Sequence, residues 1–254
     1  MLREYLAARS GDFMIGNGPT PLKRALSLAE LALGTFIVIG HNVFHIVPNE
    51  VLILFVLGWL SLRLRDGGLA SAGMEPPVSR WRRALFALVP AILKPPKSWW
   101  MTLLFAAVTA VLLQVDSVIT DPIADFFWHR QADLSSFKPL VGNLKFAAVS
   151  LAVIWTFAAF GEEISYRGYL MQRAADLGDN SRLAWWISAL YVAVLFGFGH
   201  TFKGPAGIFD SAVSGAILAA AYLLSGRNLW VAILAHGLSD TFAVAAVFSG
   251  LAGV

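Results

Sequence analysis

Long apolar segments alternate with short polar ones along most of this chain. A helix that crosses the hydrocarbon core of a bilayer needs about 20 residues at a rise of about 1.5 Å each. Seven segments approach that length: 26–47, 51–62, 98–119, 146–170, 183–202, 207–224 and 229–247. The segment 51–62 is the shortest of them. The pattern predicts an all-α, polytopic transmembrane bundle of about seven helices, within a range of six to eight.

The composition strengthens this interpretation. Of 254 residues, 57% are hydrophobic and only 14% are charged, against about 25% charged in an average soluble domain. The mean hydropathy is +0.68. These values exclude a disordered chain, a fibrous protein and an ordinary cytosolic enzyme. The chain has no Cys, which excludes disulfides, thiolate metal sites and a cysteine nucleophile. We expect a single membrane domain over residues 1–254.

Basic residues gather in two polar regions, and their placement predicts the orientation. Region 63–97 carries seven Lys and Arg residues against two acids, and the N-terminal region is also basic. Cytoplasmic loops are enriched in Lys and Arg, so we expect both regions inside and the acid-balanced segment 120–145 outside. This predicts a cytoplasmic N-terminus, in the plasma (inner) membrane if the protein is bacterial. Residues 81–93 are expected to form either an amphipathic interfacial helix or a plain connecting helix. The net charge of +3 is spread over loops and does not indicate nucleic-acid binding.

A first group of charged residues lies inside an apolar segment, at Gly161-Glu162-Glu163-Ile164-Ser165-Tyr166-Arg167. A charge at bilayer depth costs at least about 2.5–3.5 kcal/mol, so such residues are functional candidates. Glu163 and Arg167 are spaced i, i+4 and can pair on one helix face. Glu162 then lacks a partner nearby in sequence and is a candidate general base. The alternative is a structural ion pair with Glu162 at the membrane interface.

Two further groups follow, Phe196-Gly197-Phe198-Gly199-His200 and His236-Gly237-Leu238-Ser239-Asp240. A single intramembrane His is often only a hydrogen-bonded packing residue, and the flanking glycines allow close helix approach or a kink. His236 and Asp240 share one helix face, where Asp240 either contributes to chemistry or merely accepts a hydrogen bond. Converging in a water-filled pocket, the three groups could activate water and stabilise an oxyanion. This convergence requires the helix beginning near 183 to tilt or to start below the interface.

In these residues the sequence resembles the CAAX-processing and bacteriocin-processing intramembrane proteases, which include the type II CAAX prenyl endopeptidase. The family signature is EExxxR, FxxxH and HxxxN or HxxxD, in that order on separate helices. The matching residues are Glu162, Glu163, Arg167, Phe196, His200, His236 and Asp240. The resemblance places the catalytic core within 145–250, and the N-terminal part carries no motif of the family.

The resemblance also implies a role for each matching residue. Glu162 would be the general base, with His200 as its partner on the attacking water. His236 and Asp240 would bind the oxyanion. Glu163 and Arg167 would form a supporting ion pair. Asp240 stands where many members have Asn, and an ionised Asp would repel an oxyanion, so Asp240 could instead orient His236.

Cofactor use has two readings, because the family has been described both as metalloproteases and as metal-independent glutamate proteases. Zinc would use Glu162, His200 and His236 and leave one coordination position open. A zincin HExxH motif is absent from the sequence, and the candidate ligands are spread over three helices. We therefore expect that no cofactor is required, with zinc as the alternative. His41 and His45 are also spaced i, i+4 and form either a metal or path site or merely the polar end of a span.

The sequence thus predicts an intramembrane endopeptidase acting on a membrane-protein or lipidated peptide substrate in the lipid bilayer. A CAAX-type tail and a bacteriocin or leader-like peptide are the substrate types that the resemblance implies. The alternative is non-enzymatic: an immunity factor for a bacteriocin, or a proton or metal transporter. A rhomboid-type Ser214 with His236 is a weaker alternative, since Ser and Gly commonly serve helix packing in membranes.

Overall fold

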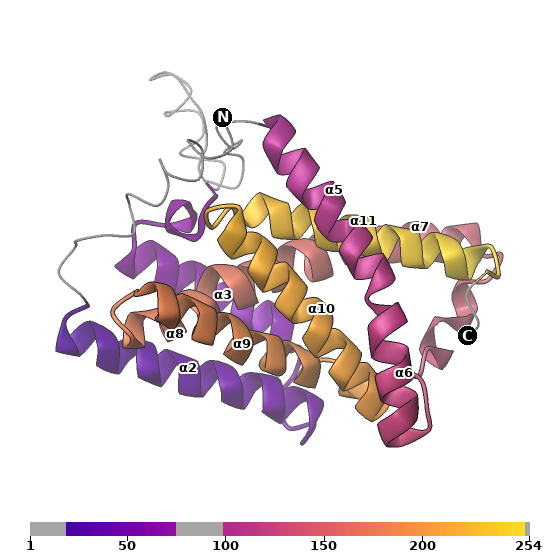
Figure 1. The fold of residues 1–254 in the computed structure, drawn as a ribbon. Coiled ribbons are helices and arrows are strands. Elements are labelled where there is room, and N and C mark those ends of the chain that lie inside the picture. The colour runs from indigo at the N-terminus through magenta and orange to yellow at the C-terminus, as the bar shows by residue number, and fades with distance from the viewer. Residues whose placement is uncertain (1–18, 75–98, 252–254) are drawn as a thin grey trace.

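The computed structural model describes residues 19–74 and 99–251, and these residues form helices and no strand (Figure 1). The fold is therefore all-α, as predicted. The N-terminal part contributes α2 (Pro21–Asn42), α3 (Glu50–Arg65) and the short η2 (Leu69–Ala72). The predicted interfacial segment 81–93 lies outside the described residues.

The remaining helices begin at Trp99. They are α5 (Trp99–Val115), α6 (Ser117–Trp128), η3 (Ser135–Leu140), α7 (Leu144–Val153), η4 (Ile154–Glu162), η5 (Ile164–Leu170), α8 (Met171–Leu177), α9 (Arg182–Phe198), η6 (Thr201–Lys203), α10 (Gly204–Leu224) and α11 (Leu229–Phe248). α7, η4, η5 and α8 form one continuous helical rod over Leu144–Leu177. Its central part, η4 and η5, is π-helical.

Polar residues start several of these helices. The side chains of Asn49, Asn143, Ser181 and Asn228 each accept a hydrogen bond from a backbone N–H in the first turn of α3, α7, α9 and α11 respectively. Such N-caps satisfy backbone donors that have no partner inside the helix. They therefore fix where the apolar segments of the sequence begin as helices.

Four of the helical stretches are long and apolar enough to cross a membrane: Trp99–Trp128, Leu144–Leu177, Thr201–Leu224 and Leu229–Phe248. α9 is apolar but has only 17 residues. α2 and α3, which contain the first two predicted crossings, form as helices without meeting the same criterion. α3 has 16 residues, a length of about 24 Å at 1.5 Å per residue. The total of seven crossings therefore stays a prediction.

A buried network of charges ties the N-terminal helices to α8. The Arg173 side chain is fully buried, and its guanidinium donates to Glu30 at 3.0 Å, to Asp176 at 3.1 Å and to Asp66. Arg65 pairs with Glu30 as well. Arg173 lies between the predicted segments 146–170 and 183–202. Its burial shows that it is part of the packing between α2, α3 and α8.

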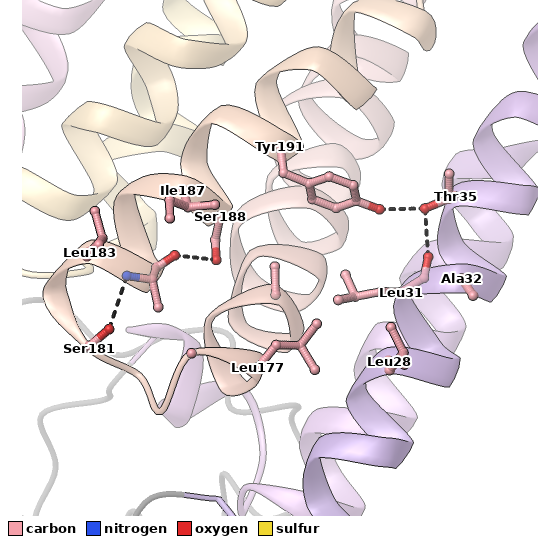
Figure 2. Close-up of a pocket in the computed structure, with 13 residues that line it drawn as sticks. Leu28, Leu31, Ala32, Thr35, Leu177, Ser181, Leu183, Ile187, Ser188 and Tyr191 are labelled. Atoms are coloured by element: carbon pink, nitrogen blue, oxygen red, sulfur yellow. Dashed lines mark hydrogen bonds between the residues drawn. The ribbon is translucent and has the colours of Figure 1, made fainter.

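An apolar groove of about 630 Å³ lies between α2, α8 and α9 (Figure 2). Leu28, Leu31, Leu177 and Ile187 line it. Its few hydroxyl groups are engaged locally: Tyr191 shares a hydrogen bond with Thr35, and other hydroxyls bond backbone groups. Among the described residues, no Asp, Glu, His, Lys or Arg side chain lines this groove, in contrast to the second cavity of the bundle.

Candidate active site

A cavity of about 610 Å³ brings the three sequence motifs together. Glu162 from η4, His200 after α9, and His236 and Asp240 from α11 all line it. Phe196, the first residue of the second motif, lines the cavity too. The structure thus collects into one cavity the four side chains that the resemblance assigns to chemistry.

The short length of α9 explains how His200 reaches this cavity. The sequence pattern predicted a helix from 183 to 202, which would have carried His200 past the depth of Glu162. Instead α9 ends at Phe198, and Gly199 caps it before η6 begins at Thr201. Glycines have low helix propensity, and the nearby Gly204 adopts a φ of 75°. His200 therefore lies at a chain turn and not within a straight helix.

The glycines beside His200 permit close approach. A Cβ on Gly197 would meet the backbone oxygen of Ile208 at 2.5 Å, so α9 and α10 contact each other closely here. A Cβ on Gly199 would meet Glu50 Oε1 and Tyr166 Oη, each at 3.1 Å. The close approach predicted from the glycines is confirmed.

Glu163 and Arg167 form the predicted i, i+4 ion pair. Arg167 Nη1 donates to Glu163 Oε1 at 2.7 Å, and both side chains are completely buried. Arg167 Nη2 donates to the backbone oxygen of Gly215 at 2.9 Å. Glu163 Oε1 also faces His236 Nδ1 at 2.9 Å. The pair therefore connects η5 with α10 and α11 beneath the cavity.

Two hydrogen bonds fix which ring nitrogen of each histidine carries a proton. His200 Nδ1 lies 2.9 Å from the backbone oxygen of Phe196, and a carbonyl oxygen can only accept. His200 is therefore protonated on Nδ1, which leaves Nε2 as the acceptor of the neutral ring. His236 Nδ1 likewise donates to the Glu163 carboxylate. Its Nε2 lies 3.5 Å from Asp240 Oδ2, a contact at the outer limit of hydrogen bonding.

Phe196 packs among the polar residues of the site. Its ring lies 4.6 Å from the Arg167 guanidinium carbon, in cation–π geometry. Its ring centroid is 4.8 Å from that of His200 and 6.0 Å from that of His236. Tyr166 meets it edge to face at 5.2 Å. One aromatic residue thus contacts the ion pair and both histidines, which gives the FxxxH spacing a packing function.

Glu162 differs from the other carboxylates of the site. Its Oε2 atom is buried and has no hydrogen-bond partner within the described part of the chain. Buried polar atoms are almost always hydrogen-bonded. An unpartnered carboxylate oxygen beside a cavity with two histidines is a natural acceptor for a proton from a ligand or a water molecule.

Sequence reasoning missed Glu50, which also lines this cavity. It is 6% exposed. Tyr166 Oη donates to Glu50 Oε1 at 3.0 Å, and the Asn42 side-chain amide donates to Glu50 Oε2. Pro48 and Asn49, which precede Glu50, are typical of a turn, so the predicted segment 51–62 begins after Glu50. An acidic residue directly before the apolar segment 51–62 was the sequence signal that could have identified it.

His41 and His45, the remaining histidine pair, have different surroundings. His41 lines the cavity and bonds the backbone oxygen of Val47 through Nδ1 at 2.7 Å. His45 is exposed and bonds the backbone of His41. Ser214 lines the cavity but donates to Asp116 at 2.8 Å, as a packing hydroxyl would.

Within residues 19–74 and 99–251, no group of three or more His, Asp and Glu side chains is arranged to hold a metal ion. The zinc set of Glu162, His200 and His236 therefore does not fit as it stands.

A comparison with protein-family models found one family to which part of the chain is similar. Residues 144–242 match the model described as type II CAAX prenyl endopeptidase Rce1-like. By this match, residues 144–242 are similar to the Rce1-like CAAX proteases. The matched region extends from α7 into α11 and includes all three motifs, whereas Glu50 lies outside it. No curated protein and no solved structure matched the chain in the corresponding searches.

The match to the Rce1-like family implies an intramembrane endopeptidase and a membrane-associated substrate. The four apolar helices agree with this, and the chain is an integral membrane protein. The family match covers the part of the chain that carries the three motifs. It says nothing of the N-terminal helices, which contribute His41, Asn42 and Glu50 to the same cavity.

Proposed function

We propose that this protein hydrolyses a peptide bond with a water molecule activated by Glu162 and without a metal ion. The observation that carries the proposal is the buried Oε2 of Glu162, which has no hydrogen-bond partner among the described residues and lies in a cavity shared with His200, His236 and Asp240. A carboxylate positioned beside a water molecule can remove its proton as the oxygen attacks. His200 Nε2, the acceptor nitrogen of the neutral ring, accepts the second hydrogen of that water and orients it.

In the first step, the water oxygen bonds to the scissile carbonyl carbon and its proton moves to Glu162. The carbonyl oxygen becomes an oxyanion in a tetrahedral intermediate. In the second step, the carbon–nitrogen bond breaks and Glu162 delivers the proton to the leaving amine. A new carboxyl group and a new amine result, and Glu162 returns to its ionised form.

His236 is the proposed oxyanion partner, and Asp240 is proposed to support it. His236 uses Nδ1–H for Glu163, so it donates to an oxyanion only when Nε2 is protonated as well. Glu163 and Asp240 flank the ring on both sides, which supports that doubly protonated form. Asp240 then acts mainly by orienting His236, because an ionised carboxylate does not itself bind an oxyanion. Preorganised donors of this kind contribute a large part of catalysis in acyl transfer.

The substrate is proposed to be a membrane-associated peptide, either a CAAX-type tail or a bacteriocin or leader-like peptide. A comparison of membrane proteins in cells carrying wild type, Glu162→Gln or Asp210→Asn tests this. Asp210 lines the same cavity outside the motifs, so its variant is a matched carboxylate-to-amide control. We expect a precursor to accumulate with Glu162→Gln alone. Identical protein profiles in all three strains would contradict the proposed proteolysis.

A further inference from the structure

Glu50 is a buried carboxylate of the active-site cavity that the proposed mechanism does not use. It is the first residue of α3, it is only 6% exposed, and it lines the cavity. A charged group that is shielded from water costs free energy unless hydrogen bonds compensate for it. The contacts of this carboxylate therefore indicate what it does in the protein.

Both carboxylate oxygens of Glu50 accept hydrogen bonds from side chains of other helices. Tyr166 Oη, from η5, donates to Oε1 at 3.0 Å. The side-chain amide of Asn42, the last residue of α2, donates to Oε2. An ionised carboxylate only accepts hydrogen bonds, so it matches a donor at each oxygen. An uncharged amide at this position would keep one acceptor and lose the other.

The turn that carries His200 lies against the same carboxylate. A Cβ on Gly199 would stand 3.1 Å from Glu50 Oε1, so the Gly199 backbone lies directly beside it. On the other side of His200, Thr201 Oγ1 donates to the backbone oxygen of Asn42 at 2.7 Å. The residues before and after His200 are therefore both held by the hydrogen-bonded pair of Glu50 and Asn42.

The ring of His200 is linked to Glu50 by a second route, through two aromatic rings. Tyr166, which donates to Glu50, meets the Phe196 ring edge to face at 5.2 Å. The Phe196 and His200 ring centroids are 4.8 Å apart, and the Phe196 backbone oxygen accepts from His200 Nδ1. Close-packed groups transmit small displacements to their neighbours. The backbone and the ring of His200 are thus both connected to one carboxylate.

We infer that Glu50 is a positioning residue for His200: its carboxylate holds residues 199–201 and the His200 ring where Nε2 faces the attacking water. The inference rests on the proposed function for the role of His200, and it assigns the end of α2 and the start of α3 to the active site. A reacting group that is misplaced by about 1 Å can lose about 10²-fold in rate. Glu50 thus acts on kcat through His200 and does not itself bind the peptide.

A double-mutant cycle between Glu50→Gln and His200→Ala tests the inference. Each full-length variant is placed in proteoliposomes with an accumulated precursor as substrate, and kcat, KM and the thermal midpoint are measured. Asp116→Asn is the matched control. Asp116 is 8% exposed and accepts a hydroxyl hydrogen bond from Ser214 at 2.8 Å, as Glu50 does from a tyrosine, but it is not among the described residues that line the cavity.

We expect Glu50→Gln to lower kcat about tenfold with KM changed by less than about twofold, because a hydrogen bond to a charged group is lost. In the His200→Ala background the same substitution should lower kcat by less than about twofold, since residues that act as a unit are not additive. Asp116→Asn should stay near the parent rate in both backgrounds. A tenfold loss in both backgrounds, no loss in either, or a rise in KM alone would overturn the inference.

The imidazole signals of His200 provide a readout that is independent of hydrolysis. In protein labelled with nitrogen-15 histidine, they are the signals that His200→Ala lacks. We expect them to shift or broaden in Glu50→Gln and to stay unchanged in Asp116→Asn. Tyr166→Phe, which keeps the carboxylate, should have the same effect and serves if Glu50→Gln does not fold. Unchanged His200 signals in the folded variant would overturn the inference.

The two readouts separate this inference from the proposed function. If Glu162→Gln hydrolyses the precursor at the wild-type rate, the proposed function fails, while the His200 signals still show whether Glu50 positions that ring. If Glu162→Gln is inactive and the His200 signals do not respond to Glu50→Gln, the proposed function stands and the inference fails.

Discussion

Glu163 Oε1 accepts a hydrogen bond from His236 Nδ1 at 2.9 Å, through the same oxygen that pairs with Arg167 at 2.7 Å. The second acid of the EExxxR motif is therefore more than the partner of the arginine. It holds an imidazole of the third motif, on α11, at a fixed ring orientation. Carboxylates that orient histidines in this way are common supports of active sites.

Glu163→Gln should therefore reduce both stability and activity. The substitution leaves the Arg167 guanidinium buried without its anion, and breaking a buried pair costs about 3–5 kcal/mol. We expect a lower thermal midpoint in detergent than for wild type. The double variant Glu163→Gln/Arg167→Met removes both charges and should recover part of the loss of stability but not of activity. A double variant less stable than Glu163→Gln would show that the pair is not the source of the loss.

Phe196 should behave as a packing residue with a catalytic effect. It contacts Arg167, His200 and His236, and deletion of a buried Phe side chain costs about 3–5 kcal/mol. Phe196→Ala is expected to lower the thermal midpoint and kcat together. Phe196→Tyr keeps the ring and should stay folded. Trp186→Ala, at a partly exposed position on the same helix, is the control. Equal losses for Phe196→Ala and Trp186→Ala would argue against a special position of Phe196.

Glu50 should matter to activity although it lies outside the matched family region. It accepts from Tyr166 and Asn42 and lies beside Gly199, the residue before His200. We expect Tyr166→Phe, which removes one donor to this buried carboxylate, to lower kcat about tenfold with little change in KM. A lost hydrogen bond to a charged group is worth about 1.5–3 kcal/mol. Gly199→Ala, whose Cβ would crowd Glu50 and Tyr166, should have a similar effect. Wild-type kcat in both variants would show that Glu50 and its hydrogen bonds do not contribute to catalysis.

The charge network at Arg173 should be structural and independent of catalysis. Its side chain is fully buried with three carboxylates around it, so Arg173→Met leaves those anions uncompensated. We expect destabilisation of about 3–5 kcal/mol with kcat of the folded fraction unchanged. Arg182→Met, at an exposed position, should change the thermal midpoint little. An inactive but fully stable Arg173→Met variant would contradict this separation of stability from chemistry.

Removal of metal ions should leave hydrolysis intact. The mechanism proposed above uses carboxylate and imidazole groups alone, so exhaustive dialysis against a chelator is expected to preserve kcat/KM. Zinc added back should not raise the rate above that of the untreated protein. Loss of activity on chelation with recovery on added zinc would instead support the ligand set of Glu162, His200 and His236.

The sequence alone predicted the all-α fold, the membrane character and the Glu163–Arg167 pair, because each depends on local spacing or overall composition. It did not predict the end of α9 at Phe198, which depends on the glycines and on contacts of Gly199 with Glu50 and Tyr166. The π-helical geometry around Glu162 and Glu163 was also missed, since the apolar pattern of a π-turn does not differ visibly from that of an α-helix.

Long-range partners explain the remaining differences. Glu50 joins the cavity through Tyr166, which is 116 positions further along the chain, and no local spacing reveals such a contact. Arg173 is buried among the carboxylates of Glu30, Asp66 and Asp176, and two of these lie more than 100 positions away along the chain. The roles assigned to Glu162, His200, His236 and Asp240 remain predictions that require kinetics.

The most direct measurement is peptide hydrolysis by purified wild type, Glu162→Gln and Asp210→Asn in proteoliposomes. The substrate is a precursor that accumulates in Glu162→Gln cells, and the thermal midpoint of each protein is measured alongside. General-base catalysis contributes about 10²–10⁴-fold, so kcat for Glu162→Gln should fall by that factor while its fold and the Asp210→Asn rate stay near wild type. Hydrolysis by Glu162→Gln at the wild-type rate would contradict a water molecule activated by Glu162.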